Sequence, residues 1–309
     1  MEILLQTGLL ILGFVLLIKG ADWFVDGASG IAKKLGIPQL VIGLTIVAMG
    51  TSIPEAAVSI SSALKGNADI TIGNIVGSNI LNVLIILGIS STIISLCVAK
   101  STIRYEIPYM IIISILLLVL GKTGNEITLL EGVILWVFFI AYFVYLFYLT
   151  KNNKEEKEEQ ERTYSLWKLL LLIAVGIFLV VLGSNFAVDG ATELAKLVGL
   201  SERFIGLTIV ALGTSLPELV TSVTAARKGN ADIAIGNIVG SNIFNILFVI
   251  GTAALITPVP FANNFVIDTC IAALCGVLLI AGCVRKKRLT RGLGIFMLVC
   301  YAGYFVYLL

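Results

Sequence analysis

Long apolar runs separated by short polar breaks make up most of the chain. Most runs reach or exceed the roughly 20 residues that a helix needs to cross a bilayer. The pattern therefore predicts an all-α integral membrane protein with ten transmembrane helices, near residues 3–30, 39–64, 70–95, 105–120, 129–150, 166–197, 203–226, 233–257, 265–284 and 292–309.

One strongly charged stretch interrupts this pattern. Residues 151–162 read KNNKEEKEEQER, which is too charged for lipid and too short for a domain. We interpret it as a solvated linker. The predicted organisation is a first five-helix repeat at 1–150, a linker at 151–165 and a second five-helix repeat at 166–309, together forming one membrane domain.

Composition supports a protein that lives in lipid. The chain is 58% hydrophobic and 13% charged, whereas soluble domains carry about 25% charged residues. It contains no His, and its five Cys form no C-x-x-C pair. We therefore expect no resident cofactor and no nucleic-acid partner, and we expect a monomer surrounded by the bilayer.

Lys and Arg are distributed unevenly between the predicted loops. If the N-terminus is outside, the inner loops hold sixteen of them and the outer loops only four, Lys65, Lys122, Lys196 and Arg203. The excess of basic residues marks the cytoplasmic side. We predict a multi-pass protein of the cell membrane with both termini outside and the 151–165 linker in the cytoplasm.

The chain contains an internal duplication. Residues 42–82 and 205–245 align without a gap at an offset of 163, and 30 of the 41 positions are identical. The similarity continues upstream, between residues 20–36 and 183–199. Five predicted spans separate equivalent positions, and an odd number places the copies in opposite orientations. This is the inverted-repeat plan of many secondary transporters.

Each copy carries a carboxylate in the middle of a predicted span. An acidic residue at that depth costs about 2.5–3.5 kcal/mol and is a functional-site hypothesis by default. Glu55 and Glu218 lie on a small and polar helix face. That face comprises Thr45, Ala48, Ser52, Glu55, Ser59 and Ser62, and in the second copy Thr208, Ala211, Ser215, Glu218, Ser222 and Ala225.

Proline directly precedes each of these glutamates. Pro54 and Pro217 cannot donate a backbone hydrogen bond to the carbonyls of Gly50 and Gly213. We expect broken helices near the bilayer midplane, with free carbonyls lining a cavity. Carbonyl, hydroxyl and carboxylate oxygens suit Na⁺ and Ca²⁺.

The following span adds further oxygen atoms. Two G-x-x-x-G pairs, Gly73 with Gly77 and Gly236 with Gly240, permit close helix approach. They would bring a second polar stripe against the glutamates, forming a four-helix cage with enough oxygens for Ca²⁺. That stripe comprises Asn74, Ser78 and Asn82, and in the second copy Asn237, Ser241 and Asn245.

Two further pairs of aspartates recur in the duplication. Asp69 and Asp232 lie in short loops at span ends, where we interpret them as helix N-caps. Asp26 and Asp189 lie near the ends of the long spans, and lining an access route is an alternative to a purely structural role.

The motifs G-T-S-I-P-E at 50–55 and G-N-I-V-G-S-N at 73–79, with their copies at 213–218 and 236–242, resemble the paired alpha repeats of the sodium/calcium exchangers. The resemblance covers essentially the whole chain and identifies it with the prokaryotic type. It implies that Ca²⁺ and Na⁺ are the transported ions. The ligands that it implies are Glu55, Ala48, Thr51, Ser52, Ser78 and Asn82, and Glu218, Ala211, Thr214, Ser215, Ser241 and Asn245.

The motif also bears on the driving ion. The proton-coupled branch of the superfamily typically has G-N-x-x-E where this chain has G-T-S-x-P-E, so the resemblance implies Na⁺/Ca²⁺ antiport. At Asn245 the chain departs from well-studied exchangers, which often have Asp there. This site would hold two carboxylates instead of three, which leaves the stoichiometry open.

Other functions remain as alternatives. A Ca²⁺/cation antiporter driven by H⁺ or K⁺ and, in a different class, a cation channel would use similar ligands. We do not expect an enzyme, because the sequence lacks Ser/Lys, Cys/His and H-E-x-x-H arrangements.

Overall fold

The computed structural model describes residues 2–152, 164–199 and 211–308, and these residues form an almost entirely helical protein. The elements of the first half, where η denotes a π-helical segment, are α1 (Glu2–Leu35), α2 (Gln39–Ile42), η1 (Gly43–Val47), α3 (Ala48–Thr51), α4 (Ile53–Leu64), α5 (Asp69–Leu81), η2 (Asn82–Leu87), α6 (Gly88–Ile93), β1 (Leu96–Cys97), η3 (Thr102–Glu106), α7 (Ile107–Gly124), β2 (Glu126–Ile127) and α8 (Leu129–Asn152). Those of the second half are α9 (Leu166–Leu197), α11 (Ala211–Thr214), α12 (Leu216–Arg227), α13 (Ala231–Phe244), η5 (Asn245–Ile250), α14 (Gly251–Ile256), β3 (Val259–Pro260), α15 (Asn264–Cys283), β4 (Arg288–Leu289) and α16 (Arg291–Leu308).

The described helices account for most of the expected spans. Eight helices are long and apolar enough to cross a membrane, and a bent pair, Gln39–Thr51 with Ile53–Leu64, makes up to nine. The expected span at 203–226 begins among residues outside the described part, so the count of ten stays a prediction. The protein is an all-helical, multi-pass membrane protein.

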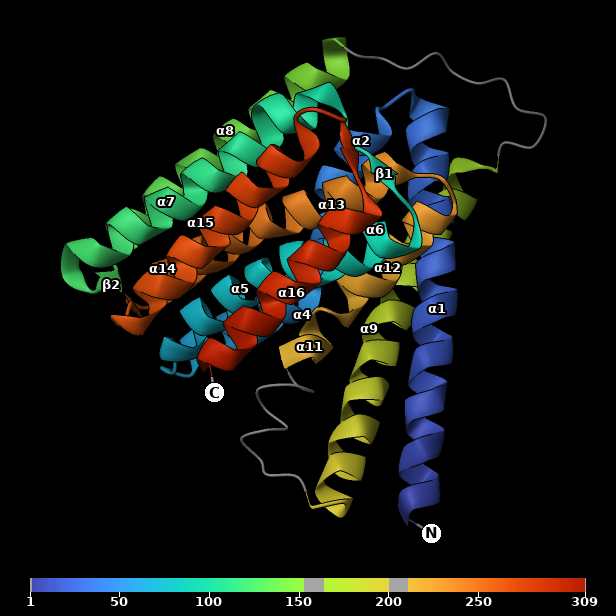
Figure 1. The fold of residues 1–309 in the computed structure, drawn as a ribbon, viewed down its shortest axis with the longest axis horizontal. Coiled ribbons are helices and arrows are strands. Elements are labelled where there is room, and N and C mark those ends of the chain that lie inside the picture. Colours follow the sequence, from blue (N-terminus) through green and yellow to red (C-terminus); the bar gives the residue numbers. More distant parts are fainter. Residues whose placement is uncertain (1, 153–163, 200–210, 309) are drawn as a thin grey trace.

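Two long helices run in a different direction from the others. α1 and α9 lie side by side and are steeply inclined to α7, α8 and α15 (Figure 1). Their backbones touch, since a Cβ built on Gly20 would lie 2.8 Å from the Val180 nitrogen and one on Gly183 2.6 Å from the Leu17 nitrogen. Glycines recur every seven residues, or about two helical turns, at Gly13, Gly20 and Gly27 and at Gly176, Gly183 and Gly190.

The core is built around the two spans that contain the G-N-I-V-G-S-N motif. Over its apolar 18-residue stretch, the span Ala231–Ile256 is 94% buried and Ile70–Ile93 is 72% buried. The corresponding values for the outer helices are 17% for α1 and 11% for α16. The motif helices are thus enclosed by protein, while the outer helices present apolar side chains to lipid.

Four short strands tie the two halves together. β1 pairs with β4 (Leu96 with Leu289), and β2 pairs with β3 (Ile127 with Val259), both antiparallel. At the offset of 163, β1 corresponds to β3 and β2 to β4. If the two halves are exchanged, each strand pairing becomes the other. This indicates an approximate two-fold relation between the halves.

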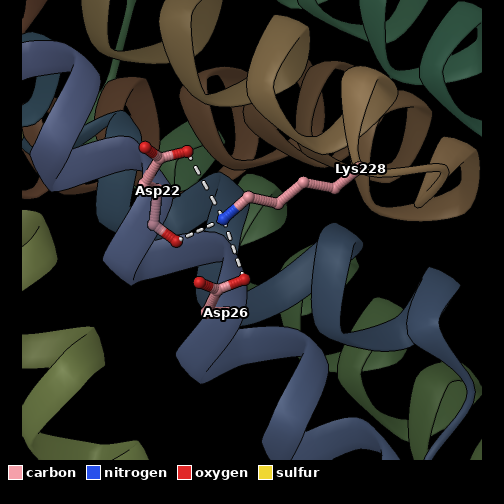
Figure 2. Close-up of polar contacts among 3 residues, drawn as sticks. All are labelled: Asp22, Asp26 and Lys228. Carbon is pink, nitrogen blue, oxygen red and sulfur yellow. Dashed lines mark hydrogen bonds and ion pairs between the residues drawn. The ribbon is translucent and has the colours of Figure 1, made fainter.

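An ion-pair cluster joins α1 to the loop after α12. The Lys228 ammonium lies 2.8 Å from Oδ1 of Asp26 and 3.4 Å from Oδ1 of Asp22 (Figure 2). It also donates a 2.9 Å hydrogen bond to the Asp22 carbonyl. Asp26 therefore contacts a basic partner in this structure, although we considered it as a lining of an access route.

Candidate cation-binding site

The helix that carries Glu55 is broken as the sequence predicts. α3 ends at Thr51, α4 begins at Ile53, and the two parts are bent by 51°. Ser52 at the junction has φ −83° and ψ 10°, outside the helical region. Pro54 occupies the first turn of α4, where a missing N–H costs nothing. Glu55 follows in that turn, where the positive end of the helix dipole favours a carboxylate.

The second copy repeats this break. Ser215 has φ −91° and ψ 3° between α11 and α12, and Glu218 lies in the first turn of α12. One expected feature differs, because the Gly213 carbonyl is not free. It accepts a 2.8 Å hydrogen bond from the Ser184 hydroxyl of α9. Ala21 is the equivalent of Ser184 in the first copy, so the Gly50 carbonyl lacks this donor.

Hydrogen bonds between the halves bring the two glutamates to one place. Ser52 of the first half donates to Oε1 of Glu218 at 2.9 Å. Ser215 of the second half donates to Oε1 of Glu55 at 3.5 Å. All four side chains are buried. The residues on either side of each proline thus form one mixed cluster instead of two separate ones.

Four buried acceptor atoms of the predicted ligands have no hydrogen-bond donor in the described part of the chain. Among the described residues, no donor reaches Oε2 of Glu55 or Glu218, or Oδ1 of Asn82 or Asn245. All four side chains are fully buried. Buried acceptors are normally satisfied, and leaving one unpaired costs about 1–3 kcal/mol. Carboxylate and amide oxygens are ligands of the kind that Ca²⁺ prefers, which makes these four atoms candidates for binding a cation.

The two asparagines also mark a change in helix geometry. Asn82 begins η2 and Asn245 begins η5, each continuing a regular α-helix. π-helical turns are rare and are frequent at functional sites, because one extra residue per turn widens the helix locally. The sequence pattern gave no indication of these segments.

Comparison with known proteins identifies the family. The profile described as "Sodium/calcium exchanger protein" matches residues 5–148 and 168–309. The chain belongs to the sodium/calcium exchanger family. The chain is 32% identical to the sodium/calcium exchanger MaX1 of Methanosarcina acetivorans, over 97% of both chains. It is 38% identical to the inner membrane protein YrbG of Escherichia coli, over 82% of this chain and 81% of that protein.

Solved structures agree with this family. The sodium-calcium exchanger NCX_Mj soaked with zero Na⁺ and Ca²⁺ matches with a TM-score of 0.86 at 31% identity, over 99% of this chain and 100% of that one. The same protein soaked with 10 mM Na⁺ and zero Ca²⁺ gives 0.84 at 33% identity, over 97% of both. The present exchanger is accordingly a cation/Ca²⁺ antiporter, and its family comprises transporters, not enzymes.

Three of the remaining predicted ligands, Ala48, Thr51 and Ser241, form hydrogen bonds between the two halves. The Ser241 hydroxyl donates to the Ala48 carbonyl at 3.3 Å, and the Thr51 hydroxyl donates to Oδ1 of Asn237 at 3.0 Å. Ser78 is buried and Thr214 is half-buried. Ala211 is the first residue of α11.

The glycine pairs act differently in the two copies. Cβ atoms built on Gly236 and Gly240 would lie 3.0 and 2.7 Å from backbone atoms of the first copy's broken helix, which confirms the expected close approach. A Cβ on Gly73 would meet only the Phe265 ring, at 3.4 Å, among the described residues. The residues of the second copy that α5 is expected to approach lie partly outside the described part, so this second approach stays a prediction.

Two predictions about the site region need correction or addition. Asp69 and Asp232 are not N-caps, since Ala68 and Asn230 hold those positions and the aspartates lie in the first helical turn. The polar stripe also omitted Asn79 and Asn242, which are buried and hydrogen-bonded at the centre of the molecule. Their occurrence in both copies, three residues before Asn82 and Asn245, was the signal that could have found them.

Proposed function

We propose that this exchanger moves Na⁺ and Ca²⁺ in opposite directions across the cytoplasmic membrane by alternating access, acting as a monomer. The observation that supports it best is the set of four fully buried acceptors, two of them carboxylates, that no donor from the described residues reaches. Two carboxylates balance the charge of one Ca²⁺, and neutral oxygens complete its coordination. The proposed ligands are those predicted from the sequence, centred on Glu55 and Glu218.

Neutralisation explains why the ions would exchange at one site. Two buried carboxylates without a cation leave an uncompensated charge in a medium of low dielectric constant, which is costly. Monovalent Na⁺ ions or a divalent Ca²⁺ would both remove that cost, and each occupant excludes the other. The family and the G-T-S-x-P-E motif favour Na⁺ over H⁺ as the driving ion.

The proposed architecture is ten transmembrane helices in two inverted five-helix repeats, 1–150 and 166–309. The offset of 163 and the reciprocal strand pairings support it. Both termini would be outside and the 151–165 linker in the cytoplasm. Asn153→Cys in a cysteine-free chain tests this orientation. Labelling of that cysteine by an impermeant reagent from outside intact cells would contradict it.

Transport by purified protein in liposomes tests the function. We expect Ca²⁺ uptake when liposomes loaded with Na⁺ are diluted into Na⁺-free medium, and no uptake without that gradient. K⁺ and H⁺ gradients imposed one at a time are the matched controls. Uptake driven by H⁺ or K⁺ alone would mean that this ion, and not Na⁺, is the coupling ion. Uptake that needs no counter-ion and does not saturate would indicate a cation channel instead.

A further inference from the structure

The inference concerns four asparagines, two in α5 and α13 and two at the start of the π-helical segments η2 and η5 that continue them, and it rests on the proposed function. We propose that Asn79 and Asn242 are positioning residues that orient the amides of Asn82 and Asn245, so that both Oδ1 atoms face the cation. Neither positioning residue contacts the ion itself. Each acts on the site asparagine of the other half.

The orientation of one amide can be deduced from a backbone carbonyl. The Asn79 side chain donates from Nδ2 to the carbonyl oxygen of Asn242 at 3.1 Å. A carbonyl oxygen can only accept, so the NH₂ end of Asn79 is fixed there and its Oδ1 points the other way. That Oδ1 accepts from Nδ2 of Asn245 at 3.1 Å. The Oδ1 of Asn245 must therefore face away from Asn79.

The reciprocal contacts orient the other half in the same way. Asn242 donates from Nδ2 to the Asn79 carbonyl at 3.1 Å, and its Oδ1 accepts from Nδ2 of Asn82 at 3.0 Å. The Oδ1 of Asn82 thus faces away from Asn242. Both site oxygens are fully buried and lack a donor among the described residues, as expected of atoms reserved for a cation.

Turning over either site amide would be unfavourable. If Asn82 were reversed, its Oδ1 would face Oδ1 of Asn242 at hydrogen-bond distance, and two buried acceptors would be left without a donor. Its NH₂ group would then face the cation, where a donor cannot coordinate. The backbone carbonyls of Asn79 and Asn242 therefore determine which end of each site amide faces the cation.

This control matters because the residues at 82 and 245 are amides. A carboxylate offers an oxygen in either orientation, so no neighbouring residue has to fix which end faces the ion. An amide offers one oxygen and must be held with the correct end toward the ion. This chain therefore needs Asn79 and Asn242 as positioning residues because it has asparagines, and not aspartates, at 82 and 245.

The test is a double-mutant cycle on equilibrium Ca²⁺ binding to purified protein in Na⁺-free detergent. In the native background, Asn242→Leu removes the acceptor for Asn82, and we expect Ca²⁺ affinity to fall roughly tenfold or more. In an Asn82→Asp background the same substitution should cause no loss. It should even increase affinity, because it removes an acceptor that opposes the new carboxylate.

The equivalent cycle, Asn79→Leu with Asn245→Asp, should give the same pattern. Asn242→Ser removes the amide without adding apolar volume, and its cycle decides the question if the leucine variant does not fold. Equal losses in both backgrounds would mean a purely structural role and would overturn the inference. Both backgrounds are compared at a pH at which the carboxylate added by Asn82→Asp is ionised, because a protonated carboxyl group would compete with Ca²⁺.

Failure of the proposed function gives a different result. If native protein does not bind Ca²⁺ in this assay, the site assignment itself fails, whatever the variants do. If native protein binds Ca²⁺ and the cycle shows no coupling, the site stands and only the positioning role of Asn79 and Asn242 is removed.

Discussion

α5 and α13 carry the same seven-residue motif, G-N-I-V-G-S-N, yet they are covered to different extents. Their internal contacts match closely: Asn74 donates to the Ser59 hydroxyl at 3.0 Å, and Asn237 donates to the Ser222 hydroxyl at 2.9 Å. The surroundings differ, because Asn237 is fully buried while Asn74 is half-buried. Duplicated sequence thus preserves the chemistry of the site more strictly than its packing.

The difference extends along one side of the site. Thr51, beside α13, is fully buried, whereas its equivalent Thr214 is half-buried. Gly236 and Gly240 press against the broken helix of the first half. Gly73 and Gly77 of α5 make no such backbone contact with another described residue, so the two motif helices are packed unequally among the described residues.

The largest expected effect comes from the two glutamates. The prediction tests whether both halves are needed equally for Ca²⁺ transport although they are packed unequally. Glu55→Gln and Glu218→Gln each remove a buried charge that a divalent ion needs. We predict that either change abolishes Ca²⁺ uptake in liposomes while the protein remains folded and monodisperse. Glu193→Gln, at an exposed position of α9, is the matched control and should transport normally. Near-native uptake by either glutamate variant would remove that residue from the site.

The second prediction tests the unequal covering directly. In a cysteine-free chain, Thr214→Cys should react with a small thiol reagent in detergent at least about tenfold faster than Thr51→Cys, because reaction requires exposure of the thiolate. Serial time points under denaturing and native conditions separate access from intrinsic reactivity. Equal native rates would show that α5 and α13 cover the site alike.

The broken helix and the meeting of the two glutamates were predictable from sequence, and the reasons can be given for particular residues. Glu55 and Glu218 stand out because a carboxylate in an apolar span is costly, and Pro54 and Pro217 require a break. The duplication doubled each signal, so chance patterns could be discarded. The nearness of the two glutamates followed once the halves were taken to meet at one interface.

Other features depend on tertiary context. No single residue type encodes the π-helical segments that begin at Asn82 and Asn245, since they depend on packing around the helix. The N-cap prediction failed because α5 and α13 begin at Asp69 and Ala231, earlier than expected, so that each aspartate already lies inside its helix. Hydrogen bonds from Asn79 to Asn242 join residues 163 positions apart, which local periodicity cannot reveal.

The third prediction concerns the two neutral ligands. Asn245→Asp would add a third carboxylate next to two others, and like charges at close range favour the protonated form. Protons should then compete with Ca²⁺ at higher pH, so the pH at which Na⁺-driven Ca²⁺ uptake is half-inhibited should rise. Asn82→Asp should act in the same direction, since Asn82 is the equivalent of Asn245 in the first half and is likewise fully buried. If neither variant shifts this pH, residues 82 and 245 do not share the electrostatic environment of the glutamates.

The smallest expected effect concerns a lysine that follows the broken helix in each half, Lys65 and Lys228. Lys228 contacts Asp22 and Asp26 of α1 (Figure 2). Its equivalent, Lys65, is exposed and forms no ion pair with another described residue. At the positions equivalent to Asp22 and Asp26, α9 has Asn185 and Asp189. The attractive charge available to Lys65 is therefore half of that available to Lys228.

Lys228→Met should accordingly destabilise the protein slightly, and Lys65→Met should not. The Lys228 side chain is 28% exposed and its partners are 36% and 54% exposed, so solvent screens the pairs and their contribution should be at most about 1 kcal/mol. Thermal unfolding in detergent at low salt measures the difference between the two variants. Raising the salt to about 1 M shortens the screening length to about 3 Å, and the difference should then disappear. A difference that persists at high salt would mean that the Lys228 stem stabilises α1 by packing, and the two ends of the molecule would then differ in shape complementarity instead of charge.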